Sequence, residues 1–252
     1  ALVGGAALNI GLDDKAVTFS MAGTTTGTGE VNLNKNASLV MQTTGSIGAG
    51  TFNMDPATAL TFIFNPTDAG DIKTTGDANI DGVLNAVALP GLYGDKGSHV
   101  VILAGGDVVG TFDNTNINGD TLLIDFSAKV NPQDVTISWE RNAFNEVPGL
   151  TINSTSVATA LEDGYDTKRV ASKNSPELND ILSAMFTLKD AALYDRVLNS
   201  WSGSEHAQVM RAAANLSEPY HMALSEHLND IRHTGGADGQ VVMLRPKGSS
   251  VS

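Results

Sequence analysis

Residues 60–64 read Leu60-Thr-Phe-Ile-Phe64, and residues 135–139 read Val135-Thr-Ile-Ser-Trp139. Both are short runs of β-branched, apolar and aromatic residues bounded by turn-forming residues, which is typical of β-strands. In the second run Val135, Ile137 and Trp139 alternate with polar residues, so they share one face of an extended chain. This alternation predicts a half-buried strand with Trp139 as its largest core residue.

Similar runs recur about every ten residues through the first part of the chain, separated by Gly, Thr, Asn and Asp. The predicted strands cover residues 16–21, 30–33, 38–42, 51–54, 60–64 and 83–89. Sandwiches, barrels and β-solenoids all show such spacing. The unequal turns and the lack of regular hairpin dipeptides favour a solenoid, in which each coil buries its inner face on the next. We therefore predict a mainly β protein, with a right-handed parallel β-solenoid over residues 1–95.

A solenoid exposes the backbone of its last coil unless something covers it. Residues 96–150 contain denser apolar runs, at 99–104, 121–124 and 135–139, and the hairpin-sized loop 114–119. We predict that this region is a C-terminal β cap. Its expected core residues are Val101, Leu103, Leu122, Ile124, Val135, Ile137 and Trp139.

After Pro148-Gly149 the apolar spacing becomes helical, and residues 151–236 are predicted to be an α-helical region. Ser175-Pro176-Glu177 has the composition of a helix start. The apolar residues that follow it at helical spacing are Leu178, Ile181, Leu182, Met185 and Phe186, and then Leu193, Val197 and Trp201. A further stripe runs from Val209 to Ile231, with Pro219 expected to interrupt the helix and Gly235-Gly236 to end it. Residues 237–252 show no clear period and are predicted to form a flexible tail.

Composition limits the classes of function. The chain has 252 residues, a hydrophobic content of 41% and a net charge of −13. Residues 1–150 alone hold 6 Lys or Arg and 16 Asp or Glu, a net charge of −10. So acidic a surface argues against nucleic acid and anionic lipid as partners. The chain has no cysteine, which excludes disulfides, a thiolate nucleophile and cysteine metal sites.

No apolar run approaches the ~20 residues of a membrane-spanning helix, so we expect no direct membrane insertion. The start, Ala1-Leu-Val-Gly-Gly5, lacks the charged and apolar parts of a signal peptide. If the parent protein is exported, we expect this chain to be a piece of its interior.

Several segments, taken in order, resemble the C-terminal passenger region of bacterial autotransporters, the self-exporting proteins of type V secretion. The segment 60–67 resembles the strand that opens the family's final coils, and 72–84 resembles the turn and return strand that follow. Residues 101–104, 110–112 and 135–142 are similar to the next strands, and residues 151–161 to the start of the helices. The pre-barrel signature of the family is similar to residues 198–207, at Leu198, Trp201, Ser202, Gly203, His206 and Ala207. Ser204 stands where the family usually has Glu.

The resemblance implies a passenger stalk at the cell surface or outer membrane, exported through the periplasm, either retained or secreted. It implies an autochaperone role for the cap, in which the C-terminal coils fold first and template the coils above them. The chain's own C-terminal membrane β-barrel is the implied partner. No barrel-type strands follow Arg232, so this chain is not expected to export itself.

Motifs for catalysis or metal binding are weak. Asp77, Asn79 and Asp81 have the spacing of a calcium loop, but Ala88 occupies the position that requires a bidentate carboxylate. We interpret this segment as a coil turn. His221, His227 and His233 are six residues apart and form no zinc motif. No nucleophile elbow or phosphate loop is present, so we predict no catalytic residue, cofactor or metal.

Three functions therefore remain open. The first is a stalk and folding module that supports adhesion or display. The second is a module that binds a host surface protein or glycan through exposed Thr and Asn ladders of residues 1–70. The third is a carbohydrate-active β-helix enzyme, which would need two or more carboxylates in one cleft. The scattered turn carboxylates of this sequence disfavour the enzyme.

Overall fold

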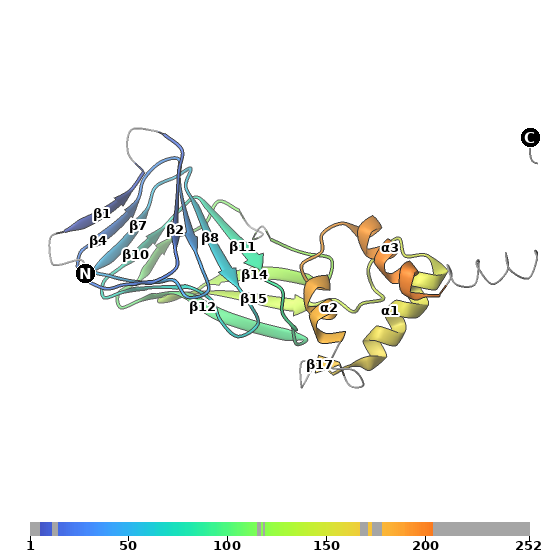
Figure 1. Ribbon diagram of the computed structural model, residues 1–252. Coiled ribbons are helices and arrows are strands. Elements are labelled where there is room, and N and C mark those ends of the chain that lie inside the picture. Colours follow the sequence, from blue (N-terminus) through green and yellow to red (C-terminus); the bar gives the residue numbers. More distant parts are fainter. Residues whose placement is uncertain are drawn as a thin grey trace, which may run out of the picture. The chain divides into compact units, whose positions relative to one another are not determined.

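The computed structural model of the chain describes residues 6–11, 15–114, 117, 119–166, 171–172 and 178–203. The protein is mainly β, and its parallel sheets form a β-solenoid that is followed in the chain by helices (Figure 1). The predicted fold class is confirmed. None of the described helices is both long and apolar enough to span a membrane.

Three full coils precede the cap. The first coil consists of β1 (Ala7–Ile10), β2 (Val17–Met21) and β3 (Thr24–Thr25). The second consists of β4 (Glu30–Leu33), β5 (Ala37–Met41) and β6 (Ser46–Ala49). The third consists of β7 (Thr51–Met54), β8 (Ala59–Phe64) and β9 (Asp71–Thr74). A further coil begins with β10 (Ala78–Ile80) and β11 (Val83–Ala88).

Each coil places one strand in each of three parallel sheets, in the orders β1-β4-β7-β10, β2-β5-β8-β11 and β3-β6-β9. Register follows the alternation of apolar residues. Leu39 of β5 pairs with Leu60 of β8, and Met41 pairs with Phe62, and all four side chains are buried. A slip of one residue would turn every one of these side chains toward water, so the apolar pattern specifies the pairing.

The cap adds one strand, β13 (Val108–Gly110), to the first sheet by parallel pairing with β10, and its other strands continue the third sheet. These are β12 (Lys96–Ala104), β14 (Ile124–Val130) and β15 (Asp134–Arg141). β12 pairs in parallel with β9 on one side and antiparallel with β15 on the other, and β14 and β15 form a hairpin. The third sheet therefore ends in three antiparallel strands in the order β12-β15-β14.

The helical part contains α1 (Ile152–Gly164), the short strands β16 (Tyr165–Asp166) and β17 (Ala171–Ser172), α2 (Leu178–Met185) and α3 (Ala191–Trp201). α1 begins at Thr151, whose side chain accepts a hydrogen bond from the backbone of Ser154. α3 begins at Asp190, whose carboxylate accepts hydrogen bonds from two backbone N–H groups of the first turn. Both are standard N-terminal caps that satisfy otherwise unpaired donors.

The predicted strands 30–33 and 51–54 have the observed bounds, and the other four predicted strands of the coils agree within one residue at each end. The sequence analysis missed the short strands β1, β3, β6, β9 and β10 as separate elements. The predicted strand 121–124 is wrong, because β14 begins only at Ile124. The expected helix start at 175–177, the stripe 209–231 and the tail 237–252 lie outside the described residues.

The apolar residues of α3 that the sequence analysis found at helical spacing do not form its buried face. Leu193 and Trp201 are each 38% exposed, whereas Tyr194 and Leu198 are fully buried. Both sets have helical spacing; α3 packs against α1, and the buried Tyr194 donates a hydrogen bond to the backbone oxygen of Phe144. Ile181 of α2 is likewise exposed, while Leu182 and Met185 are buried.

Candidate functional site at the capped end of the solenoid

Five of the seven expected cap core residues are buried, and two are not. Val101, Ile124, Val135, Ile137 and Trp139 are at most 6% exposed. Leu103 is 46% exposed, because the pairing of β12 with β15 shifts register between Val100 and Ile102. This bulge turns Val101 and Ile102 inward in succession and Leu103 outward. Leu122 is only partly buried and lies before β14, and its neighbour Leu123 takes the core position.

Trp139 lies in a cluster of rings where the third coil meets the cap. Its indole is stacked on Phe64 with the ring centroids 6.1 Å apart, and it meets Tyr93 edge to face at 5.8 Å. The His99 ring lies 5.2 Å away on β12, and Phe126 of β14 packs on Phe64. Side chains from β8, β12, β14 and β15 therefore seal the apolar interior.

Gly97 of β12 lies opposite Trp139 in the sheet. A Cβ atom at this position would overlap the six-membered ring of the indole. The absence of a side chain at Gly97 therefore makes room for Trp139. The indole Nε1 is buried and has no hydrogen-bond partner among the described residues, so Trp139 contributes here through apolar packing.

Arg141, two residues beyond Trp139, joins the cap to α1. Its guanidinium makes a bidentate pair with Glu162, with nitrogen to oxygen distances of 2.8 and 2.6 Å. The Arg141 side chain is only 5% exposed. The guanidinium carbon lies 5.7 Å from the Phe144 ring centroid and 5.4 Å from that of Tyr165, which is cation–π distance.

Electrostatics at this pair favour the charged forms. Burial opposes the charge of Arg141, but the Glu162 and Asp95 carboxylates raise its pKa above the ordinary value. Burial also opposes the charge of Glu162, but Arg141 and the backbone N–H of Phe144 lower the pKa of this carboxyl group. The pair therefore remains ionised within a mostly apolar junction.

Tyrosine hydroxyls tie the helical part to the cap. Tyr165 donates a hydrogen bond to the backbone oxygen of Tyr93 at 2.9 Å, and Tyr194 of α3 donates one to that of Phe144 at 2.9 Å. The ring of Phe186 packs against Tyr93, Phe144 and Tyr165. Burial raises the pKa of Tyr93, Tyr165 and Tyr194, so these hydroxyls stay protonated and act as donors.

The two ends of the solenoid differ in how their strand edges are covered. At the cap, the Asn114 side chain accepts a hydrogen bond from the backbone N–H of Leu84 and donates one to its carbonyl oxygen. Asn114 thus replaces the missing neighbour strand of β11. At the opposite end β1, β2 and β3 are edge strands. Phe19 of β2 pairs with the buried Leu39, and so points inward, yet it is 38% exposed.

An asparagine ladder runs along the first sheet. Asn32 donates to Asn9 at 3.0 Å, Asn53 to Asn32 at 2.7 Å and Asn79 to Asn53 at 2.7 Å, each through its side-chain amide. These residues lie on the outer face of β1, β4, β7 and β10, where they alternate with buried residues. The ladder joins successive coils by side-chain hydrogen bonds.

The calcium-loop residues have other hydrogen bonds. Asp77 accepts from the backbone N–H of Asp107 at 3.0 Å, Asp81 accepts from that of Gly82, and Asn79 belongs to the ladder. Asp77 and Asp81 flank β10 rather than surrounding a loop. Among the described residues, no group of three or more His, Asp or Glu is arranged to hold a metal ion.

The expected pre-barrel motif begins in α3. Leu198 is fully buried, Trp201 is 38% exposed, and Ser202 and Gly203 follow the helix, with Gly203 in the left-handed region at φ +71°. A left-handed glycine just beyond a helix is a common way for a helix to end. His206 and Ala207 lie outside the described residues.

Sequence reasoning missed the residues that join the cap to the helices. Arg141 and Glu162 are 21 residues apart and carry no local signal of pairing. Tyr93 precedes the predicted cap by three residues, and no periodicity marks it as buried. A clue was available in Phe144, Tyr165 and Tyr194, because large aromatic residues in otherwise polar segments are commonly buried. The chain matches no protein-family model, no curated protein and no solved structure.

Proposed function

We propose that this chain is the C-terminal passenger segment of an autotransporter, a cell-surface stalk whose cap folds first and templates the preceding coils. The observation that carries the proposal is the difference between the two ends of the solenoid. One end is sealed by Trp139 and Asn114, and the other presents edge strands and inward-facing side chains such as Phe19. An end of the second kind accepts another coil, because its outer backbone groups pair with no further strand of the described residues and its apolar surface is in register.

The cap is suited to start folding because it contains a hairpin, β14–β15, whose contacts are close in sequence. β14 and β15 form a hairpin, and β12 joins the same antiparallel sheet. Hairpins form faster than parallel pairings, which need longer loops to close. Burial of apolar surface contributes ~25 cal/mol per Å² and would drive this folding without the hydrolysis of a nucleotide.

Addition of coils would then proceed one rung at a time. The asparagine ladder gives each new coil an amide partner in register, as between Asn53 and Asn32. The inner face gives it an apolar surface, as between Leu60 and Leu39. Both features repeat from coil to coil, which is what a templating surface requires.

Pulsed hydrogen exchange during refolding from urea tests the order of folding. We expect amides of β12 and β15 to become protected before those of β1 and β4. Simultaneous protection of all strands, or earlier protection of the first coil, would refute the templating role.

Surface display tests the secretion class. The chain is fused ahead of an autotransporter barrel, and protease digestion of intact cells measures exposure. We expect protease added to intact cells to reach the fusion, which shows that it is exported, and the folded fusion to resist mild digestion. Less of a Trp139→Ala fusion is expected to reach the surface in this folded, protease-resistant form. Equal protease-resistant display of both fusions would show that the cap has no role in export.

A further inference from the structure

β14 is an edge strand of its sheet, with β15 as its neighbour on one side. The backbone N–H of Phe126 points away from β15, since it donates to the Asp120 carboxylate at 2.7 Å. In an antiparallel pair this direction repeats at every second residue. The backbone groups of Ala128 and Val130 therefore face outward as well, along an edge that pairs with no strand of the described residues.

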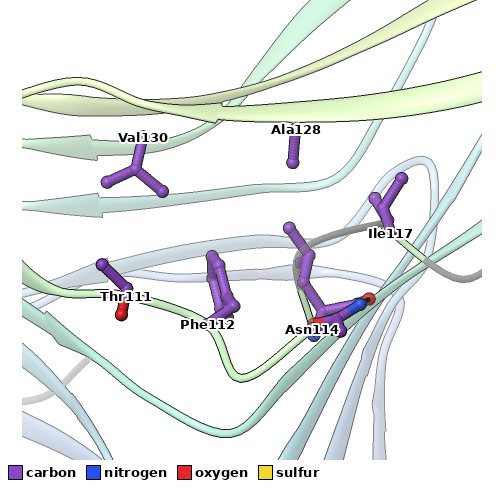
Figure 2. Close-up of a pocket in the computed structure, with 7 residues that line it drawn as sticks. Thr111, Phe112, Asn114, Ile117, Ala128 and Val130 are labelled. Atoms are coloured by element: carbon purple, nitrogen blue, oxygen red, sulfur yellow. Dashed lines mark hydrogen bonds between the residues drawn. The ribbon is translucent and has the colours of Figure 1, made fainter.

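A pocket of about 140 Å³ lies beside this edge. Figure 2 shows Ala128 and Val130 on one side of it and Thr111, Phe112 and Asn114 on the other. Its remaining lining residues are Leu84 and Ile117. The volume is close to that of an engineered apolar cavity that binds benzene, so it is large enough for one aliphatic side chain.

Ala128 and Val130 lie on the inward face of β14, where alternation predicts buried side chains, but they are not buried. Ile124 and Phe126 alternate inward on β14 and are buried, and Ala128 and Val130 continue the same face. Ala128 is nevertheless exposed, and Val130 is 37% exposed. The inner face of β14 is thus left uncovered at Ala128 and Val130.

An open strand edge beside a side-chain pocket is the arrangement by which sheets bind extended peptides. We propose that β14 binds an extended segment of another polypeptide as an added strand, with one aliphatic side chain in the pocket. Main-chain hydrogen bonds to Ala128 and Val130 supply affinity, and the pocket selects the side chain. This surface lies at the capped end, away from the first coil's open edge, so it is independent of the proposed templating.

The acidic charge near the pocket indicates the composition of the polypeptide segment that β14 would bind. Asp113 is exposed between the pocket residues Phe112 and Asn114, and residues 1–150 carry a net charge of −10. Basic residues two positions before and after the aliphatic residue would share its face and lie on the side of this carboxylate. The residues between them would share the opposite face with Lys129, so they should be uncharged.

A second copy of this chain fits less well. Pairing of two β14 edges about a two-fold axis near Ala128 would place the two Lys129 side chains on one face as diagonal neighbours, within reach of each other, where their like charges repel. An edge lysine is also a common device against self-pairing. The net charge of −13 opposes self-association further.

The test uses the whole 252-residue chain and a fluorescein-labelled peptide, Thr-Lys-Thr-Leu-Thr-Lys-Thr, in a fluorescence anisotropy titration. We expect saturable binding. Peptides with Asp in place of Leu, or Glu in place of both Lys, are expected to bind at least about tenfold more weakly. A peptide N-methylated at alternate amides on the β14 side should lose binding, because it cannot form the strand.

Protein variants locate the site. Ala128→Phe fills the pocket and is expected to weaken binding about tenfold, whereas Ser127→Phe, on the opposite face of the same strand, leaves it unchanged. No saturable binding to the unaltered chain would overturn the proposal, as would full binding by Ala128→Phe or by the N-methylated peptide. A dimer of the chain that the peptide dissociates would overturn the choice of partner. The peptide series needs no protein variant, so the proposal remains testable if Ala128→Phe does not fold.

Discussion

Replacement of Trp139 by alanine removes the largest side chain that closes the solenoid. The indole is 6% exposed and has ring partners on β8 and β12 as well as Tyr93 before the cap. The void would open between the third coil and the cap, where strands on both sides are held by sheet hydrogen bonds. Little collapse of the surrounding structure is therefore expected.

The cost follows from burial and packing. Removing a buried tryptophan costs about 3 to 5 kcal/mol, and the cost is higher where the site cannot collapse. One contribution works in the other direction, because the buried Nε1 has no partner among the described residues and its burial costs about 1 to 3 kcal/mol. We therefore expect a loss of about 2 to 4 kcal/mol in the free energy of unfolding, and a much smaller loss for Trp139→Phe.

Stopped-flow circular dichroism measures how this loss divides between folding and unfolding rates. If half or more of the packing is present in the transition state, Trp139→Ala should slow refolding at least about fivefold. Phe52→Ala, in β7 of the third coil, removes a fully buried ring and is the matched control. We expect it chiefly to speed unfolding. Ile137→Val and Ile47→Val, both at buried positions, provide a milder pair if the alanine variants do not fold.

Unchanged refolding by Trp139→Ala together with slowed refolding by Phe52→Ala would refute the argument. It would place the folding nucleus in the coils instead of the cap. Helix content should also remain nearly intact in Trp139→Ala, and a large loss of helix would show that the cap and the helices do not fold separately.

Three further predictions concern neighbouring contacts. Gly97→Ala should cost about 1 to 3 kcal/mol in urea unfolding, and less in the presence of Trp139→Phe, because the overlap is with the outer indole ring; equal losses in both backgrounds would contradict this. Glu162→Gln should cost about 2 to 3 kcal/mol at pH 7, because it leaves a buried guanidinium with a neutral partner. Because the pKa of Glu162 is lowered in the folded state, its ionised form stabilises the fold above about pH 4.3, and this stabilisation is lost on acidification. The stability of Glu162→Gln should therefore fall less steeply as the pH is lowered; parallel plots of stability against pH for the two proteins would contradict this. Asn114→Ala should cost about 1 to 3 kcal/mol in thermal or urea unfolding, because it leaves both backbone groups of Leu84 without their partner; an unchanged stability would show that water replaces the amide.

The strands that could be predicted are those in which period and burial coincide. Along β8 and β15 every second side chain is apolar and buried, so the sequence pattern is also the structural one. β6 reads Ser46-Ile-Gly-Ala49 and β3 is only two residues long. Such segments are strands because their neighbours pair with them, and that information lies in residues one coil away.

The exposure of Leu103 and of Leu193 has a common physical origin. The bulge in β12 exposes Leu103, and the burial of Tyr194 exposes Leu193 on α3. In each case both alternatives are apolar, so composition could not decide between them. The choice depends on the partner surface: β15 fixes the bulge, and α1 selects the face of α3. Spacing identifies an amphipathic element but not which of two apolar faces is buried.

The pairing of Arg141 with Glu162 bears on the order in which the cap and the helices assemble. Arg141 lies at the end of β15, directly beyond the ring cluster, and its countercharge comes from α1. Until α1 docks, the guanidinium can remain hydrated at the rim of the cap, so the β14–β15 hairpin can form at no cost in buried charge. Once α1 docks, the charge is paired and covered by Phe144 and Tyr165, and opening the junction would require breaking a bidentate ion pair together with the Tyr165 hydrogen bond. The arrangement thus allows the cap to fold alone and holds the helices firmly only after it has folded.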